Sequence, residues 1–215
     1  MKRLLFIRHG ESLLNKERCV QGQLDSSLTE TGIKQALSLL PELKKIKAET
    51  LTSSPLLRAK ETADIIAKEL KIQRAIENNI MELFMGEWEG RSFKELIDEN
   101  KEFFHDFIGK PADTEIPGAE NISIFKKRII EWLDNMLQME ENTHIIVTHA
   151  GVINTILCEV LDQDMNSLWH FKNDNCSICE ITFNSGISRV LRINDTSHLG
   201  EELKNSFKIV ERLNA

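Results

Sequence analysis

The chain has 215 residues, of which 41% are hydrophobic and 28% are charged, and its formal net charge is −7. This composition excludes a disordered protein, and the negative charge argues against nucleic acid or an anionic membrane as the main partner. No apolar run approaches the roughly 18 residues that a membrane span needs, and the first apolar run is too short for a secretory signal. We therefore expect a cytoplasmic globular protein.

The first half of the chain alternates strands with helices. Ser27 and Glu30 have the spacing of a capping box, with Thr29 as a competing N-cap, and Pro55 fits the first turn of a helix. The spacing of apolar residues predicts a strand over 3–8, a helix over 26–40, a strand over 48–54, a helix over 55–70 and a short strand over 72–77.

The second half continues the alternation, which favours an α/β fold with a largely parallel sheet. No internal repeat or long linker divides the chain, so we expect one domain over 1–215, with residues 80–121 forming a lid-like excursion over the sheet. The predicted elements are an amphipathic helix over 92–109, a helix over 121–139, a buried strand in "HIIVTHAG", a helix over 151–161 and closing strands over 176–183 and 188–194.

The chain has four cysteines, and only Cys176 and Cys179 form a C-x-x-C pair. A redox motif of this spacing needs a helix after it, and a zinc site needs a second pair of ligands. Strand-like residues follow the pair instead. We interpret all four as ordinary thiols of a reducing compartment.

Two of the predicted strands end alike. "LLFIRHG" and "HIIVTHAG" each place a histidine and then a small residue after a short apolar run. Ligands gather beyond the carboxyl ends of strands in open α/β sheets, so His9 and His149 could face one pocket. A small residue such as Gly10 would let a backbone N–H approach a ligand, and the helix after His149 would add its positive end. Together with Arg8 and Arg58, whose planar forks suit phosphate oxygens, these features predict a site for a dianion.

Each of these residues also has an ordinary explanation. A histidine at the end of a strand is more often a hydrogen-bonding structural residue than a catalyst. Arg58 could be a surface arginine of its helix. The prediction of a dianion site therefore rests on the combination of residues and not on any one of them.

Five sequence blocks in order resemble the signature of the histidine phosphatase superfamily, the phosphoglycerate-mutase-like enzymes. They are "RHGESLLN", "QGQLDSSLTETGIKQA", "SSPLLRAKETA", "MELFMGEWEG" and "VTHAGVI", and the resemblance covers essentially the whole chain. It implies a three-layer α/β/α fold with a mostly parallel central sheet. It also implies a phosphoric monoester hydrolase that works through a phosphohistidine without a metal or cofactor, its partner being a small phosphorylated metabolite.

The same resemblance assigns roles to single residues. His9 would be the nucleophile, and Glu82 would protonate the leaving oxygen and later activate water. The residues that would hold the phosphoryl oxygens as part of the catalytic set are Arg8, Arg58 and His149. The further substrate contacts that the resemblance implies are Asn15, Gln21, Gly22, Ala150 and, near the C-terminus, His198.

The substrate is implied less sharply. "ELFMGEWEG" and "LWHFKNDNCSICEI" resemble the alpha-ribazole phosphatases of cobalamin assembly, so we expect alpha-ribazole 5′-phosphate as the substrate. "NDTSHLGE" resembles metal-independent phosphoserine and broad-specificity phosphatases instead. Phosphoglycerate mutases carry an arginine-tyrosine-rich insertion after the acid, and this chain has no tyrosine, which favours hydrolysis.

Two further alternatives concern macromolecular partners. A regulatory module that docks on phosphorylated proteins would have a shallow pocket, whereas the aromatic residues over 80–121 favour a covered small-molecule site. The apolar strands over 176–183 and 188–194 could pair across a homodimer, although a buried sheet edge has the same pattern.

Overall fold

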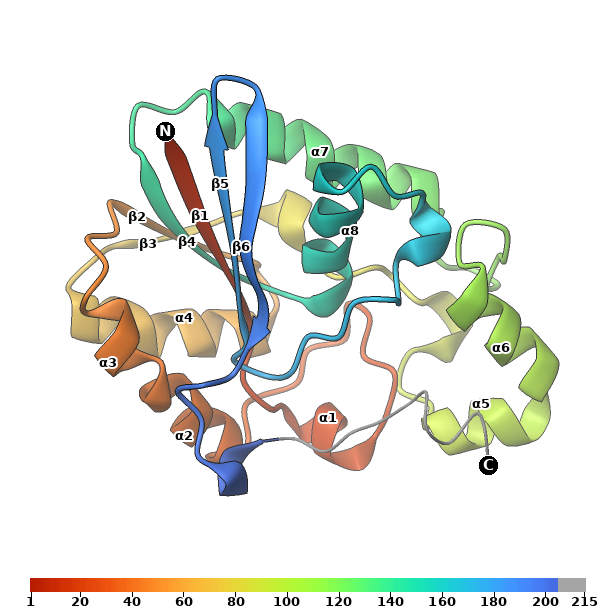
Figure 1. The fold of residues 1–215 in the computed structure, drawn as a ribbon. Coiled ribbons are helices and arrows are strands. Elements are labelled where there is room, and N and C mark those ends of the chain that lie inside the picture. Colours follow the sequence, from red (N-terminus) through yellow and green to blue (C-terminus); the bar gives the residue numbers. More distant parts are fainter. Residues whose placement is uncertain (205–215) are drawn as a thin grey trace.

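Six strands form one sheet at the centre of the computed structural model, which describes residues 1–204 (Figure 1). They lie in the order β3-β2-β4-β1-β5-β6. Neighbours from β3 to β1 are parallel, and β5 and β6 add an antiparallel hairpin at one edge. The strand bounds are β1 Lys2–Arg8, β2 Thr50–Ser53, β3 Arg74–Ile76, β4 Thr143–Thr148, β5 Ile178–Asn184 and β6 Ile187–Asp195.

Helices cover both faces of the sheet, which confirms the predicted three-layer α/β/α architecture (Figure 1). On one face lie α7 (Ile122–Leu137) and α8 (Ala150–Val160), and on the other α2 (Glu30–Ser38), α3 (Leu40–Leu43) and α4 (Leu57–Leu70). The remaining elements are α1 (Leu13–Glu17), α5 (Phe93–Glu99), α6 (Lys101–Gly109), and the 3₁₀ turns η1 (Asn78–Ile80), η2 (Gly86–Trp88), η3 (Met165–Ser167) and η4 (Glu201–Leu203). Within residues 1–204, none of the helices combines the length and apolar character needed to cross a bilayer.

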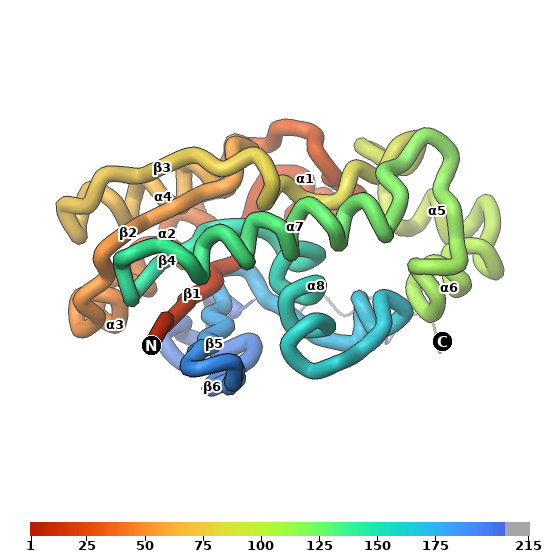
Figure 2. The backbone as a smooth tube through the Cα atoms, turned by 90° about the horizontal axis from the view of Figure 1, so that it is seen from above, coloured from red at the N-terminus to blue at the C-terminus, as the bar shows by residue number. Residues whose placement is uncertain are grey.

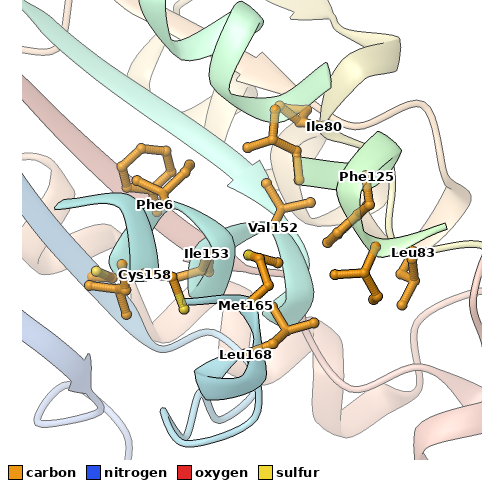
Figure 3. Packing of buried hydrophobic residues seen from close by; sticks show 14 of the residues in the cluster. Phe6, Ile80, Leu83, Phe125, Val152, Ile153, Cys158, Met165 and Leu168 are labelled. Atoms are coloured by element: carbon orange, nitrogen blue, oxygen red, sulfur yellow. The ribbon is translucent and has the colours of Figure 1, made fainter. Parts of the chain in front are cut away.

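β1 shows why the sheet needs a cover on each face. Its four central residues are fully buried. Successive side chains of a strand point to opposite faces, so Leu4 and Phe6 join the core beneath α7 and α8, and Leu5 and Ile7 join the core beneath α2 and α4. Figure 3 shows the first of these cores around Phe6 and Ile153. A continuous apolar run is what a strand buried on both faces requires.

The first predicted helix begins later than its periodicity indicates. α2 starts at Glu30, and Thr29 caps it by accepting a hydrogen bond from the N–H of Gly32 at 3.0 Å. Ser27 is not the cap, because it lies three residues before the first residue of α2; its backbone carbonyl accepts from the N–H of Leu13 at the start of α1. The five-residue α1 was not predicted, since it is too short for a periodic apolar face.

The single helix predicted over 92–109 was wrong. Asn100 leaves the helical region with φ −153° and ψ 86°, so the segment folds as the two helices α5 and α6. The Oδ1 atom of Asn100 accepts from the N–H of Phe103 at 3.0 Å and so begins α6. The N–H of Asn100 donates to the carbonyl of Leu96 and closes α5.

The register between β1 and β4 brings distant parts of the sequence together. Arg8 is paired with Thr148 at the carboxyl ends of the two strands. The N–H of His9 then donates to the carbonyl of Thr148 at 3.0 Å, which places His9 next to His149. Both views place α5 and α6 at the end of the molecule opposite α3 (Figures 1 and 2).

Candidate active site

His9 follows β1 with its ring orientation fixed. Its Nδ1 atom lies 2.8 Å from the carbonyl oxygen of Gly10, and because a carbonyl can only accept, the ring proton is on Nδ1. Nε2 therefore keeps its lone pair, to which Nε–H of Arg58 donates at 3.2 Å. The carbonyl of His9 accepts from Nδ2 of Asn175 at 3.0 Å. Ring and backbone are thus both held, with Nε2 next to a guanidinium.

The environment keeps this ring neutral. Burial lowers the pKa of His9 well below its ordinary value of 6.5, and the positive charges of Arg58 and Arg8 lower it further. At neutral pH Nε2 therefore carries a lone pair and no proton, which is the state in which an imidazole can act as a nucleophile once the hydrogen bond from Arg58 is given up.

Gly10 has a different role from the one that the sequence suggests. Its N–H donates to Oγ1 of Thr62 at 3.0 Å and so is not aimed at a ligand. A Cβ atom at this position would lie 2.6 Å from the carbonyl oxygen of Gly32. The glycine is therefore required by the close approach of β1 to the start of α2.

Arg58 is only 1% exposed, so it is not a surface arginine of α4. Its Nη1 and Nη2 donate to the carbonyls of Leu24 and Gly22 at 2.8 and 2.7 Å. Burial lowers the pKa of Arg58 to about 10, with the carboxylate of Glu82 opposing the shift. The side chain is therefore still charged at neutral pH and is oriented by backbone carbonyls.

Arg8 is the second cation of the site. Its Nη1 donates to the carbonyl of Asn173 at 2.6 Å. Burial lowers the pKa of Arg8, while the negative charges of Glu82 and Asp174 oppose that shift. Two guanidinium groups therefore flank the His9 ring, a cationic arrangement suited to a phosphate group.

His149 lies beside His9, away from the cavity surface. The two ring centroids are 5.2 Å apart with their planes at 57°. The Nε2 atom of His149 lies 2.8 Å from Oγ of Ser54, and the side chain is fully buried. Burial, followed by the charge of Arg58, lowers the pKa of His149 well below 6.5. This ring is also neutral at neutral pH.

Glu82 reaches the site from the segment after η1. The Oγ1–H of Thr148 donates to the carbonyl of Ile80 at 2.8 Å and ties that segment to the end of β4. One carboxylate oxygen of Glu82 accepts from the N–H of Leu83 at 2.9 Å, and the other accepts from the N–H of Gly151 at 3.2 Å. The carboxylate therefore contacts the first turn of α8, immediately after His149.

The loop after α1 forms one side of the site. Oε1 of Gln21 accepts from Oγ of Ser12 at 2.7 Å, and Oδ1 of Asn15 accepts from the N–H of Ser12 at 3.2 Å. Gly22 has φ +50°, and a Cβ there would lie 1.9 Å from Oε1 of Glu89. Only glycine suits both the left-handed backbone and this contact.

A cavity of about 510 Å³ opens onto these groups, and the predicted site residues other than His149 and His198 all line it. Its outer wall is aromatic. Trp88 stacks on Phe104 with centroids 5.6 Å apart and meets Phe107 edge-on at 5.2 Å. Phe107 in turn lies 5.9 Å from Trp169. The residues 80–121 thus supply much of the cover over a charged floor.

His198 is not brought to the site. It follows β6, does not line the cavity, and has its pKa lowered by burial. Its predicted contact with the substrate therefore has no geometric support.

Sequence reasoning used the segment that precedes β5 only for its resemblance and missed what its single residues do. The backbone carbonyl of Asn173 holds Arg8, and the amide of Asn175 holds His9. Trp169 and Phe171 line the cavity. A contact through a backbone carbonyl has no residue signature, so the available signal was only the position of "HFKNDN" before a closing strand.

The thiols and carboxylates do not form a metal centre in the part of the chain that the structure describes. Among residues 1–204, no three His, Cys, Asp or Glu side chains are grouped so that they could hold a metal ion. All four cysteines are free. Burial raises the pKa of the Cys179 thiol to about 12, so this buried cysteine is a thiol at neutral pH.

Comparison with known proteins gives a consistent result. The family model of the histidine phosphatase superfamily (branch 1) matches residues 4–196. Phosphoserine phosphatase 1 of Hydrogenobacter thermophilus is 31% identical over 98% of this chain and 100% of its own length. The adenosylcobalamin/alpha-ribazole phosphatase of Escherichia coli K12 is 25% identical over 93% and 98% of the two chains. The solved structure of Bacillus stearothermophilus YhfR superposes with a TM-score of 0.86 at 28% identity, covering 92% of this chain and 99% of that one.

Proposed function

The chain belongs to the histidine phosphatase superfamily (branch 1) and is a phosphoric monoester hydrolase, and from this premise we propose that it forms a phosphohistidine on His9 without a metal. The observation that carries this proposal is the neutral His9 ring, whose Nε2 lone pair faces Nε–H of Arg58 on the cavity floor. A small phosphorylated metabolite is the proposed substrate, because cavities of about 300–1,000 Å³ are typical of small-ligand sites.

The first step transfers the phosphoryl group to the protein. The Nε2 lone pair of His9 attacks phosphorus, the P–N bond forms and the P–O ester bond breaks with its electron pair on the leaving oxygen. Glu82, in its protonated form, gives that oxygen its proton. Arg8 and Arg58 stabilise the charge on the other phosphoryl oxygens, which is the main catalytic requirement of phosphoryl transfer.

The second step returns His9 to its starting state. Glu82, now a carboxylate, takes a proton from a water molecule as the water attacks phosphorus. The P–N bond breaks with its electron pair on Nε2, and inorganic phosphate leaves. The same carboxyl group thus acts as acid and then as base, so its position matters in both steps.

The wall of the cavity favours a substrate with an aromatic or other apolar group beyond its phosphate. The aromatic residues that line the cavity include Trp88, Phe104, Phe107, Trp169 and Phe171, and the rings of Phe107 and Trp169 lie 5.9 Å apart. Such rings stack well on a planar leaving group. The benzimidazole of alpha-ribazole 5′-phosphate fits this description and is our first choice of substrate.

Phosphoserine is the second candidate, supported by the name of the Hydrogenobacter relative. Its ammonium and carboxylate groups would need charged partners in the cavity. The charges of Lys172 and Asp174 in the cavity lining pair with each other at 2.9 Å. Because these two charges are already paired, they would bind the ammonium and carboxylate groups of phosphoserine less well than the aromatic wall would bind a planar ring.

A panel of phosphate esters tests the proposal. Phosphate release is measured in the presence of a chelator with alpha-ribazole 5′-phosphate, L-phosphoserine, 3-phosphoglycerate and phenyl phosphate. We expect His9→Ala to lower kcat by more than about 10³-fold for each ester. His144→Asn is the matched control, because His144 lies at the opposite end of β4 and its ring is hydrogen-bonded only to Thr50 and Glu141 among the described residues. Normal turnover by folded His9→Ala would refute the mechanism, and a requirement for added metal would refute metal independence.

A further inference from the structure

The segment that carries Glu82 has little regular structure to fix it. Apart from η1, the residues between β3 and η2 lie outside helices and strands. Backbone carbonyls in such a segment need donors from elsewhere. Three of them, at Asn79, Met81 and Glu82, accept from one side chain, Arg128 of α7, at 2.6, 2.9 and 3.1 Å. The backbone on which Glu82 stands is therefore anchored to a helix of the core.

Glu120 holds the other side of the same guanidinium. Its two carboxylate oxygens accept from Nε and Nη2 of Arg128 at 2.7 and 2.9 Å. The backbone N–H of Glu120 also donates to the carbonyl of Phe84 at 2.9 Å. The Arg128–Glu120 pair thus contacts the chain on both sides of Glu82 as well as at Glu82 itself.

The hydrogen bonds use the full capacity of the guanidinium. An arginine side chain has five N–H groups, and the five bonds of Arg128 comprise three to carbonyls and two to Glu120. The two side chains are only 16% and 14% exposed, so these bonds are largely shielded from water. A lysine has three donors and no fixed fork, so it could not replace this arrangement.

The aromatic residue one turn earlier on α7 completes the anchor. The guanidinium carbon of Arg128 lies 4.8 Å from the ring centroid of Phe125. Figure 3 shows the Phe125 side chain next to Leu83 and Val152, the residues that follow Glu82 and Gly151 in the chain. The glutamate, its neighbour and the start of α8 therefore pack against one side of α7.

From these contacts we infer that Arg128, together with Glu120, is a positioning residue for Glu82 in proton transfer. The inference rests on the proposed role of Glu82. Arg128 does not line the cavity as the described residues outline it, so it acts through the backbone of Glu82 and not on the substrate. Its removal should misplace the carboxyl group while leaving the floor of the cavity intact.

Two aryl phosphates separate this role from a merely structural one. Phenolate is a poor leaving group that needs a proton, whereas p-nitrophenolate leaves readily without one. The value of kcat/KM reports the transfer to His9 and not the later hydrolysis, which is common to both esters. A positioning defect should therefore lower kcat/KM for phenyl phosphate and spare p-nitrophenyl phosphate, and a loosened fold should lower both equally.

We expect Arg128→Gln to lower kcat/KM for phenyl phosphate by about 10- to 100-fold, the effect of a displacement of about 1 Å at a reacting group. The value for p-nitrophenyl phosphate should stay within about threefold. Arg128→Lys should behave alike, since charge alone does not restore the fork. Glu120→Gln keeps the shape of the side chain that pairs with Arg128. It should also lower kcat/KM for phenyl phosphate and spare p-nitrophenyl phosphate, with a smaller loss. When Glu82→Gln is added to Arg128→Gln, the further loss of kcat/KM for phenyl phosphate should be much smaller than the loss that Glu82→Gln causes in the parent protein.

Arg192→Gln is the matched control. Arg192 is 22% exposed and forms ion pairs with Glu42, Glu180 and Asp195 away from the site. This variant should lose stability without changing the ratio of the two esters. Equal losses on both esters in Arg128→Gln and Glu120→Gln, or no loss on either, would overturn the inference. If Glu82→Gln alone changes kcat/KM equally for the two esters, the proposed role of Glu82 in proton transfer is refuted instead.

Discussion

At the scale of single residues, Gly151 leaves no room for a side chain beside Glu82. A Cβ atom built there would lie 2.3 Å from Oε1 of Glu82 and 3.3 Å from Cζ of Phe125. Alanine is favoured over glycine within a helix by roughly 0.5–1 kcal/mol, so the methyl group would not weaken α8 itself. It would instead force the carboxylate away from the first turn of that helix.

We predict that Gly151→Ala lowers kcat/KM for phenyl phosphate by about 10- to 100-fold, because the carboxyl group of Glu82 must move. Initial rates on purified protein measure this effect. Gly109→Ala is the control, since no heavy atom lies within 4 Å of a Cβ at that position. A fully active Gly151→Ala variant would show that the position of Glu82 in this structure is not the one used in catalysis.

At the scale of elements, the division between α5 and α6 shapes the aromatic wall. α6 carries Phe104 and Phe107, both of which line the cavity. Its first turn depends on the Oδ1 atom of Asn100, which accepts from the N–H of Phe103. A side-chain cap of this kind satisfies a backbone donor that the helix itself cannot.

Asn100→Ala is expected to lower the free energy of unfolding by about 1 kcal/mol, because the N-cap acceptor is lost. In a chain of this size the melting temperature should fall by about 2–4 °C. KM for phenyl phosphate should rise as the wall loosens, with kcat little changed. Asn100→Asp keeps the capping oxygen and should resemble the parent protein. Equal melting temperatures for the alanine and aspartate variants would contradict the capping role.

The elements also show what a sequence pattern can and cannot predict. β1 and α7 were predictable because an apolar run and a helical period each imply one structure. The break at Asn100 was not, because an asparagine within a helical period has the same pattern whether it caps a helix or continues one. The anchoring by Arg128 was equally hidden, since its acceptors at Asn79, Met81 and Glu82 are backbone carbonyls.

At the scale of the whole molecule, the largely parallel sheet and the meeting of His9 with His149 followed from the rules of parallel sheets. The cavity wall did not. The wall is assembled from a segment that precedes α7 in the sequence and a segment that follows α8. Phe107 of the first and Trp169 of the second have rings 5.9 Å apart. Contacts of this kind depend on how loops pack over the sheet, and no local periodicity encodes them.

The charge of the molecule is also unevenly distributed. The chain has a net charge of −7, yet the half-buried Arg8 and the buried Arg58 lie near two imidazole rings, whose pKa values are lowered by burial and by those cations. A dianion bound on the cavity floor would raise the pKa values of these rings, because an adjacent negative charge favours the imidazolium. His9 is the proposed nucleophile, so we expect the added proton on His149, which does not line the cavity but whose ring centroid lies 5.2 Å from that of His9.

Anion binding should therefore take up a proton. The free pKa of His149 lies well below 6.5, and a bound dianion raises it, so between the two values binding adds a proton and becomes tighter as pH falls. Sulfate is a suitable probe, because it stays dianionic throughout this range. We predict that its Kd falls as the pH is lowered from the pKa of the anion-bound state toward that of the free protein, by up to about tenfold per pH unit for one proton taken up.

Tryptophan fluorescence can follow the titration, since Trp88 and Trp169 line the cavity. His149→Asn removes the titrating ring but not the arginines, so its sulfate affinity should be weaker and nearly independent of pH. His144→Asn controls for the loss of a buried histidine elsewhere and should keep the pH dependence. A Kd that is constant with pH in the parent protein would mean that Arg8 and Arg58 alone carry the anion. His149 would then be a structural support for His9 and not a phosphate ligand.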